Sequence, residues 1–534
     1  MQVALAVHPT GQAGRAPLPA LVACLALLAS VAAGCCSPLR FPAAPLSVKD
    51  TPEGRVSAYD TNGDRRPDYF TTQDKSGRIV RIAYDQTMRK GEPDSTVNLD
   101  EIHPSLCRHI VFIVDGIGYD VVEEFRKEGR LRLFYPPVRV ISTFPAMTDI
   151  ALGDVFQSVP CIALEAVHFD HQANRIVGGD ADYLSLRNED WARHVDYRAG
   201  TLVDPLAYLY PSAIFNKELA DILQLFDRRD RSVIVAYLVS TAGLGTREGR
   251  EGQRKALDRI DRLCQELVWR TRGCVKFTMF SDHGHTLVRS ERIDFRGFLA
   301  GKGWRVTDHL EKPRDVVPVE YGIVTYASFA TLDRAALAAD LLRHPGVDLV
   351  TYQEGDAVVV EKPDAKAYIE RKDDGGFGPQ YRYRTEKGDP LELLPLIQSG
   401  KVKRGPDGYA TDMDRYSQGD AWFQQTATHR YPDALDRLWR AFRGQTEHVP
   451  DVIASLKDGY CAGSASRAFF LPYVASTHGD LARNSSTAFI ISTTEPRDQS
   501  LGRTSTMRSR DLPPLLQSLT DRPWPPPVGG NGKP

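Results

Sequence analysis

Short polar clusters follow apolar runs at two places in this 534-residue chain, and both contain residue types that can bind a metal ion. In HIVFIVDG, Asp115 follows five apolar residues, and in FTMFSDHGHT, Asp282 and His283 follow another apolar run. A carboxylate beside an imidazole offers oxygen and nitrogen ligands for a divalent ion. Asp115 alone is also typical of an ordinary helix N-cap, so the metal interpretation depends on the clusters meeting in space.

A third cluster, VISTFPAMTD, has the composition of an anion-binding helix start. It places Ser142 and Thr143 at the end of a predicted strand and Pro145 two residues later. Proline is favoured in the first helical turn, where free backbone N–H groups can bind a phosphate. We therefore predict that Pro145 opens a helix facing an anion; an ordinary capped helix is the alternative.

The elements that would position these clusters alternate between strand and helix from residue 108 onward. Helices are predicted at 120–129, 217–226 and 250–269, where apolar residues recur at helical spacing. Between them lie short β-branched runs typical of buried parallel strands, namely HIVFIVDG, VRVIS, SVIVAYLVS, VKFTMFSD and TAFIIST. This alternation predicts a doubly wound, mainly parallel α/β sheet, in which ligands bind beyond the carboxyl ends of the strands.

The pattern changes in the second half of the chain. Residues 321–449 contain strand-like runs around a helix predicted at 333–343, which indicates a small α+β insertion between two core segments, 105–320 and 450–520. Residues 521–534 are rich in proline and glycine and predict a disordered tail.

The N-terminal residues predict export. An apolar stretch from Leu18 to Gly34 follows Arg15 and precedes Cys35, and residues 1–35 resemble a bacterial lipoprotein signal peptide with a lipobox-like end. Ala32 stands where Leu or Val is more usual. We expect lipid on Cys35 and anchoring to a bacterial membrane, facing the periplasm or the cell surface. Plain secretion and an uncleaved anchor are the alternatives.

A tether at residues 36–55 is predicted to lead into a small module at 56–100. Four oxygen-bearing side chains in this module have the spacing of positions 1, 3, 5 and 9 of an EF-hand-type calcium loop: Asp60, Asn62, Asp64 and Asp68. Arg65 and Thr71 replace the usual glycine and acid at positions 6 and 12. Bound calcium and an Asx-rich turn are both open interpretations.

Composition excludes some classes of function. With 67 basic and 69 acidic residues the formal net charge is -2, so the chain lacks the general positive charge of nucleic-acid-binding proteins, and we expect no nucleic-acid partner. Hydrophobic residues make up 42% and charged residues 25%, which is typical of a globular protein. No C-x-x-C pair is present, so a zinc ribbon is not expected.

Taken together, the clusters resemble the alkaline phosphatase superfamily, most closely its type I phosphodiesterase and nucleotide pyrophosphatase branch. The order matches: a strand ending in Asp-Gly, then Thr-Phe-Pro, then Ser-Asp-His-Gly, then a late Thr-His-Gly at residues 477–479. The resemblance covers about residues 107–520, with 320–450 matching poorly. It implies an alkaline phosphatase type of fold and a phosphoric ester hydrolase that uses a divalent metal, with zinc, manganese and iron all suitable.

The resemblance also implies roles for single residues. Thr143 would be the nucleophile and would share one metal ion with Asp115, Asp282 and His283. His478 would belong to a second ion.

Two departures from the family pattern affect this site. The family's second-ion pair, Asp-x-x-x-His, falls on Ala242 and Thr246 in one register of STAGLGTREG and on Ser240 and Leu244 in the other, so neither register supplies ligands. Ala146 stands where the family has a phosphate-binding Asn, a role that Thr148 could take. Three further histidines could complete a remodelled site, although core or exposed roles are expected for each: His168, His171 and His285.

Two functions therefore stay open. One is an exported, metal-dependent phosphoric ester hydrolase with an incomplete second metal site, acting on a small phosphoester or a lipid-linked substrate. The other is a weak or inactive relative that serves as a binding or assembly lipoprotein.

Overall fold

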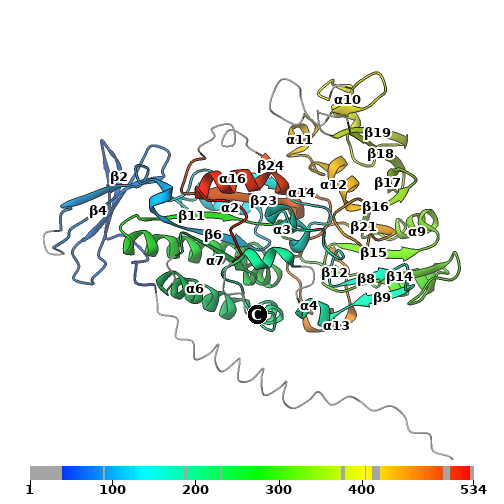
Figure 1. Ribbon diagram of the computed structural model, residues 1–534, viewed down its shortest axis with the longest axis horizontal. Coiled ribbons are helices and arrows are strands. Elements are labelled where there is room, and N and C mark those ends of the chain that lie inside the picture. The colour runs from blue at the N-terminus through cyan, green and yellow to red at the C-terminus, as the bar shows by residue number, and fades with distance from the viewer. Residues whose placement is uncertain are drawn as a thin grey trace, which may run out of the picture. The chain divides into compact units, whose positions relative to one another are not determined.

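The protein is described by a computed structural model over residues 39–87, 91–185, 189–228, 231–373, 379–402, 404–411, 421–496 and 506–528 (Figure 1). The predicted signal peptide and Cys35 lie outside these residues. Within the described ranges, no helix combines the length and the apolar character needed to cross a membrane.

A six-stranded sheet carries the polar clusters, with the strand order β10-β6-β11-β23-β7-β24. Five strands run in one direction and β23 runs in the other. The strands are β6 (Arg108–Val114), β7 (Val138–Ile141), β10 (Val233–Leu238), β11 (Val275–Phe280), β23 (Thr487–Ser492) and β24 (Thr506–Arg508). The predicted α/β class with a mainly parallel sheet is confirmed.

The direction of β23 differs from the parallel strand predicted for TAFIIST. Gly284, just beyond the carboxyl end of β11, donates a backbone hydrogen bond to Ser485 at 2.9 Å, shortly before β23 begins. The chain therefore enters β23 from the edge where β11 ends and must run back along it. The apolar run alone could not show this, because buried strands of either direction have the same composition.

Helices cover both faces of this sheet, as a doubly wound arrangement requires. Figure 1 shows α6 (Pro211–Arg228) and α7 (Ser240–Arg270) on one side and α16 (Leu512–Thr520) on the other. Helix α2 (Tyr119–Lys127) shares a hydrophobic core with α6 and α7, and α3 (Thr148–Phe156) contacts α16. Helix α7 starts ten residues before the predicted helix at 250–269, with a kink at Gly249, whose φ is +60°.

Helix α3 begins at Thr148 and not at Pro145, which corrects the predicted helix start. Ala146 donates its backbone N–H to Gly479 at 3.2 Å, and Met147 keeps extended dihedrals. The contact of Ala146 with a distant segment and the extended backbone of Met147 place the start of the helix after these residues.

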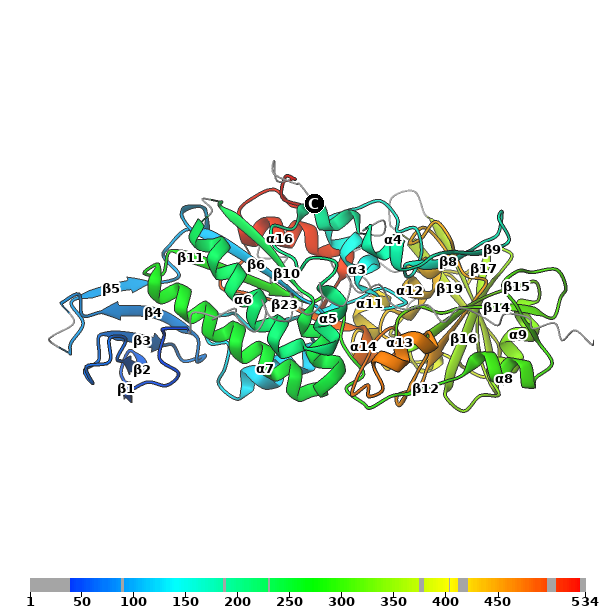
Figure 2. The same cartoon turned by 90° about the horizontal axis from the view of Figure 1, so that it is seen from below.

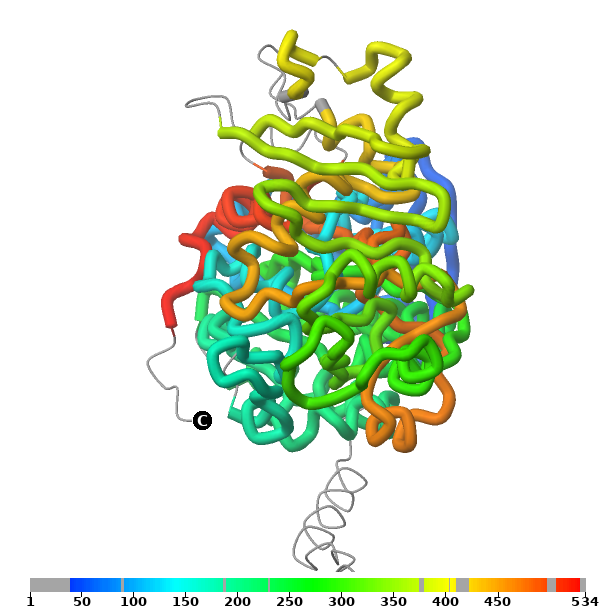
Figure 3. Tube along the Cα trace, turned by 90° about the vertical axis from the view of Figure 1, so that its right-hand side faces the viewer, coloured from blue at the N-terminus to red at the C-terminus, as the bar shows by residue number. Residues whose placement is uncertain are grey.

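The predicted insertion is a nine-stranded sheet, with the order β13-β14-β15-β21-β16-β17-β18-β19-β20. Figure 3 shows most of its strands side by side in green to yellow, and β21, which follows later in the chain, is orange. The strands are β13 (Arg305–Val306), β14 (Asp315–Val319), β15 (Tyr326–Thr331), β16 (Val347–Glu354), β17 (Ala357–Lys362), β18 (Ala365–Asp373), β19 (Pro379–Lys387), β20 (Ala410–Thr411) and β21 (Val452–Leu456). The sheet exceeds the bounds predicted for the insertion, because β13, β14 and β21 belong to it.

Shorter elements connect and cover the two large sheets (Figure 2). The helices are α4 (Asp180–Leu184), α5 (Asp204–Leu209), α8 (Phe295–Gly301), α9 (Arg334–Leu341), α10 (Leu394–Gln398), α11 (Ala421–Thr426), α12 (Ala434–Ala441), α13 (Ala465–Phe470) and α14 (Arg483–Ser486). Two small strand pairs are β8 (Val167–Asp170) with β9 (Arg175–Gly178), and β12 (Glu291–Arg292) with β22 (Tyr460–Cys461).

A five-stranded antiparallel sheet occupies the region before the core. It contains β1 (Ser47–Thr51), β2 (Gly54–Tyr59), β3 (Tyr69–Gln73), β4 (Ile79–Tyr84) and β5 (Ser95–Asn98). Phe41 is buried, and its backbone N–H donates to Glu266 of α7 at 2.6 Å. The tether predicted for residues 36–55 is therefore wrong from Phe41 on, because an aromatic anchor and strand pairing hold this segment.

The C-terminal segment also differs from the predicted tail. Trp524 is buried, stacks near Phe156 with ring centres 5.2 Å apart, and donates its indole N–H to the Val155 carbonyl at 2.9 Å. Residues 521–528 are thus ordered against α3, while 529–534 lie outside the described residues.

Candidate active site

The predicted metal ligands meet at the carboxyl edge of the six-stranded sheet. Asp115 directly follows β6, and Asp282 and His283 follow β11. His478 lies in the segment before β23, and its ring stacks on that of His283 with centres 3.8 Å apart. Because β6 and β11 are adjacent and parallel, their carboxyl ends coincide, which brings these groups together.

Three acceptor atoms face one another in this cluster. His283 Nε2 lies 3.2 Å from Asp282 Oδ2 and 3.7 Å from Asp115 Oδ1. His283 Nδ1 lies 3.0 Å from the Gly284 carbonyl, which can only accept, so Nδ1 carries the proton and Nε2 presents a lone pair. Neither Asp115 Oδ1 nor Asp282 Oδ2 accepts a hydrogen bond within the described ranges. Buried acceptors facing one another fit a cation, so these residues are suited to a divalent metal.

Burial shifts the pKa of every ligand candidate toward its neutral form. Burial raises the pKa of Asp115 well above its usual range, and the charge of Asp282 raises it further. The pKa of Asp282 is also raised, chiefly by burial. Burial lowers the pKa of His283 to about 4 and that of His478 to about 3, so both imidazoles are neutral at pH 7. Neutral imidazole is the form that binds a metal.

Neighbouring groups fix the orientation of the carboxylates. The Tyr237 hydroxyl donates to Asp115 Oδ2, and the Gly116 N–H donates to Asp282 Oδ1 at 3.1 Å. Thr241 Oγ1 donates to the Asp115 carbonyl at 2.8 Å. The sequence analysis missed Tyr237, although its position near the end of β10 was a usable signal, since β10 pairs in parallel with β6.

The structure separates the two threonines of the third cluster. The Thr143 side chain is 1% exposed, and its hydroxyl donates to the Pro145 carbonyl at 3.0 Å. The buried Arg437 donates to the Thr143 carbonyl at 2.9 Å. Thr148, at the start of α3, is partly exposed, and its Oγ1 lies 3.2 Å from His283 Nε2. The hydroxyl that reaches the predicted metal ligands is therefore that of Thr148.

Of the three further histidines named from the sequence, His285 lies in the cluster, and His168 and His171 do not. His285 is 1% exposed and lies in the cluster, with its ring centre 5.3 Å from that of His478. His168 stacks on His448 at 3.9 Å, and His171 lies 3.4 Å from Asp451, so neither belongs to the cluster.

Helix α7 follows β10 at the same edge of the sheet. It contains the positions at which the family pattern has its second-ion Asp-x-x-x-His pair. Thr246 lines a cavity together with His478 and Asp115. Ser240 instead donates to the buried carboxylate of Glu218, and Leu244 belongs to the hydrophobic core. Of the two registers, the one that contains Ala242 and Thr246 is therefore the one that reaches the site.

The cavity has a volume of about 430 Å³ and opens above the cluster. Its polar wall includes Arg198, whose guanidinium pairs with Glu189 and with Asp204 at 3.2 Å. The other walls are mainly aromatic and apolar and include Met147, Leu164, Tyr183, Trp191, Tyr208, Tyr321, Phe470 and Leu471. A space of this size accepts a small organic molecule.

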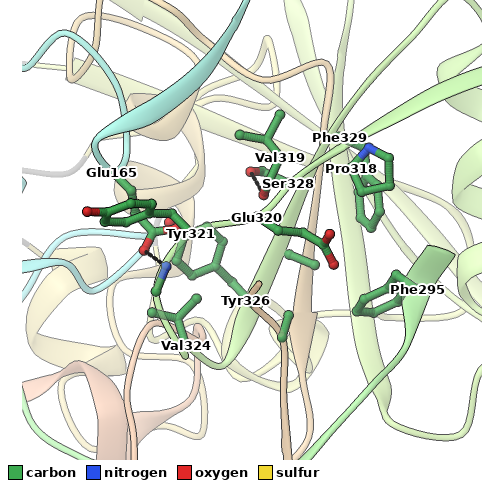
Figure 4. Close-up of a pocket in the computed structure, with 14 residues that line it drawn as sticks. Glu165, Phe295, Pro318, Val319, Glu320, Tyr321, Val324, Tyr326, Ser328 and Phe329 are labelled. Carbon is green, nitrogen blue, oxygen red and sulfur yellow. Dashed lines mark hydrogen bonds between the residues drawn. The ribbon is translucent and has the colours of Figure 1, made fainter. Parts of the chain in front are cut away.

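A smaller pocket shares a wall with this cavity (Figure 4). Glu165, Tyr321 and Val324 line both spaces, and Glu165 Oε1 accepts a hydrogen bond from the Gly322 N–H at 2.9 Å. Burial raises the pKa of Glu165 to about 7.

The calcium-like loop is closed by its own backbone. Asp60 accepts hydrogen bonds from the N–H groups of Gly63 at 2.6 Å and Arg65 at 2.7 Å, and Asn62 accepts one from Asp64 at 2.8 Å. Asp68 accepts one from the Thr61 hydroxyl at 2.7 Å. These are the contacts of an Asx-rich turn. Calcium binding by Asp60, Asn62, Asp64 and Asp68 stays a prediction.

Comparison with known proteins gives similarity only at the level of solved structures. No protein-family model matches the chain, and no curated protein sequence matches it. Murine ectonucleotide pyrophosphatase/phosphodiesterase 5 is 11% identical with a TM-score of 0.40, covering 79% of this chain and 97% of its own. The human protein of that name is 11% identical with a TM-score of 0.41, covering 78% of this chain and 95% of its own.

A bacterial hydrolase gives a similar result. Phosphonoacetate hydrolase from Sinorhizobium meliloti 1021, in complex with phosphonoformate, is 10% identical with a TM-score of 0.43, covering 78% of this chain and 96% of its own. Because all of these TM-scores lie below 0.5, no substrate, nucleophile or metal is transferred from these proteins.

Proposed function

We propose that this chain is a metal-dependent phosphoric ester hydrolase whose substrate binds in the cavity above Asp115, Asp282 and His283. The observation that supports this most directly is the position of Thr148. Its hydroxyl lies 3.2 Å from His283 Nε2, beside two buried carboxylates with unpartnered oxygens, and it lines the 430 Å³ cavity. Asp115 and His478 of the cluster line the same cavity as Thr148, and a hydroxyl beside a cation-binding cluster is the arrangement that nucleophilic phosphoryl transfer needs.

The residues that would hold the ion are Asp115, Asp282 and His283, with His478 beside them. A bound divalent ion would supply Lewis-acid chemistry by neutralising charge on the phosphoryl oxygens. Tyr237 and Gly116 orient the two carboxylates through hydrogen bonds. The Gly284 carbonyl fixes the tautomer of His283.

Thr148 would be the nucleophile, in place of Thr143. Its hydroxyl would give up its proton to solvent and its oxygen would bond to phosphorus, while the bond from phosphorus to the ester oxygen breaks and that oxygen takes a proton from water to leave as the alcohol. Water would then cleave the phosphothreonine, releasing phosphate or a phosphomonoester and restoring the hydroxyl. Thr143 lacks access to the cavity, because its side chain is 1% exposed and its hydroxyl is bonded to Pro145.

The cavity walls indicate the substrate class. Aromatic and apolar side chains suit an organic group attached to the phosphate, as in a small phosphodiester or a lipid-linked phosphoester. The absence of ligands at Ala242 and Thr246 favours slow turnover. It is also the observation that supports the second candidate, a binding or assembly protein without turnover.

The test compares isosteric substitutions at the two threonines. With an activated aryl phosphodiester and saturating zinc or manganese, Thr148→Val should lower turnover at least about a hundredfold, while Thr148→Ser should retain much of it. Mass spectrometry of a quenched reaction, with fragmentation that separates Thr148 from Thr143, should find the phosphoryl group on Thr148. If Thr143→Val loses activity and Thr148→Val keeps it, the nucleophile is Thr143, as the sequence predicted. Metal binding without turnover in the wild type would favour the binding protein.

A further inference from the structure

His285 is a buried imidazole whose ring makes no hydrogen bond. Both Nδ1 and Nε2 are buried and lack a partner within the described ranges, and the residue is 1% exposed. Leaving a buried polar group unpaired is energetically unfavourable. Such a residue therefore points to a partner that the polypeptide itself does not provide.

Two glycines make room for this ring. A Cβ at Gly116 would lie 2.5 Å from His285 Nε2, and a Cβ at Gly245 would lie 3.1 Å from Nδ1. Gly116 also has a φ of +72°, which disfavours any other residue. The end of β6 and the second turn of α7 are thus shaped around an imidazole at position 285.

Two more imidazoles beside it are already oriented as metal ligands. His283 Nδ1 donates to the Gly284 carbonyl at 3.0 Å, and His478 Nδ1 donates to the Ala146 carbonyl at 2.8 Å. Each ring therefore keeps its Nε2 lone pair free of a proton. Donation of the remote N–H to a backbone carbonyl is the usual support of a metal-bound histidine.

We propose that His285 joins His283 and His478 as the three nitrogen ligands of one zinc ion, next to the carboxylates of Asp115 and Asp282. One ligand atom from each imidazole lies within 4.8 Å of the other two. Three neutral imidazoles favour zinc over manganese or magnesium, which prefer oxygen. His283 belongs both to this group of three imidazoles and to the group that it forms with Asp115 and Asp282. Because its single free lone pair can bind only one ion, the two groups cannot each hold an ion through His283. We therefore expect a single zinc per chain.

This inference deepens the proposed function, because it concerns the same centre, but it is measured by metal binding. The full chain without its metal would be titrated with zinc against a competing chelator, and the zinc-loaded form studied by X-ray absorption. We expect one zinc with three imidazole ligands in the wild type. His285→Gln should weaken zinc binding by more than about tenfold and leave two imidazoles.

A matched control is His109→Gln, which changes another buried histidine. His109 Nε2 is bonded to Thr278 at 2.8 Å, and the residue lies near the start of β6, away from the cluster. Zinc affinity and imidazole number should not change in this variant. If His285→Gln does not fold, the imidazole number of the wild type decides alone.

Two results would overturn the proposal: zinc bound by fewer than three imidazoles in the wild type, or His285→Gln with unchanged affinity and imidazole number. The outcome is separable from that of the proposed function. Zinc held by three imidazoles in a chain without turnover would support the inference and end the hydrolase proposal. The opposite result would be turnover that is lost when Asp115 is replaced but is unaffected by His285→Gln, with the same number of imidazole ligands in that variant as in the wild type. It would support the hydrolase proposal and overturn the inference about His285.

Discussion

Glu218 shows, at the scale of single residues, how burial outside the metal cluster shapes the behaviour of this protein. Its side chain is fully buried in α6, accepts a hydrogen bond from Ser240 and adjoins the start of α7. Burial raises its pKa from 4.5 to about 8, despite the opposing hydrogen bond. The group is therefore protonated in the folded protein at pH 7 and ionised in the unfolded chain.

This shift predicts a pH dependence of stability with a definite sign. The contribution of Glu218 is fully present below pH 4.5 and is lost as the pH rises to about 8, by on the order of 1 kcal/mol per pH unit. Glu218→Gln cannot ionise, so urea unfolding between pH 5 and pH 8.5 should show a smaller fall in stability than the wild type. Equal slopes for both proteins would contradict the assignment. Asp227→Asn in the same helix, where the carboxylate is 46% exposed, is the control.

At the scale of elements, the first two turns of α7 decide whether the site can hold a second ion. Thr246 lines the cavity, whereas Leu244 lies in the core. Helical spacing places positions 242 and 246 on one face. The family pattern would have its carboxylate and imidazole there, and this chain has Ala242 and Thr246 instead.

Restoring that pair tests the register of α7. Ala242→Asp with Thr246→His should raise the metal content by one ion per chain and speed hydrolysis by up to about a thousandfold, since a Lewis-acid contribution of about 4 kcal/mol corresponds to that factor. Metal analysis and turnover are the measurements. Ser240→Asp with Leu244→His is the matched control. It should add no metal, because Leu244 packs in the hydrophobic core and Ser240 is bonded to Glu218, so neither side chain reaches the cavity.

At the scale of the whole molecule, the cavity depends on segments that are far apart in the sequence. The sheet edge supplies Asp115 and Tyr237, while the nine-stranded region and its connections supply Tyr321 and His478. Residues 321–449 matched the family poorly, and the structure shows that this part of the chain contributes a wall of the cavity. From this region Tyr321, Gly322, Ile323 and Val324 line the cavity, while most of the other lining residues lie between Met147 and Thr246.

Export is a prediction for the whole chain, and it rests on residues outside the described ranges. We propose that the protein is lipidated at Cys35 and anchored to a bacterial membrane. Cys35→Ser should move it from the membrane fraction to the soluble fraction, as measured by fractionation and by mass spectrometry of the N-terminal peptide. Cys36→Ser is the matched control and should stay at the membrane. Wild-type protein found without lipid in the cytoplasm would contradict this proposal.

Local composition was enough to predict five strands of the six-stranded sheet, the edge at which its polar clusters meet and three candidate metal ligands. Apolar runs of β-branched residues predict buried strands wherever they occur, and parallel strands bring their carboxyl ends to one edge. The positions of Asp115, Asp282 and His283 directly after such runs were therefore enough to predict that they meet. Those predictions depend on local composition and on a general rule of sheet topology.

Which threonine and which third histidine reach the cluster depends on tertiary contacts that local composition does not reveal. Backbone contacts between Ala146 and Gly479 keep the chain extended past Pro145, so α3 starts late and presents Thr148 in place of Thr143. The space left by Gly116 and Gly245 admits His285, although these glycines are separated from it by 169 and 40 positions. Such choices depend on contacts between distant segments, and no local pattern of residue types encodes which segment will be the neighbour.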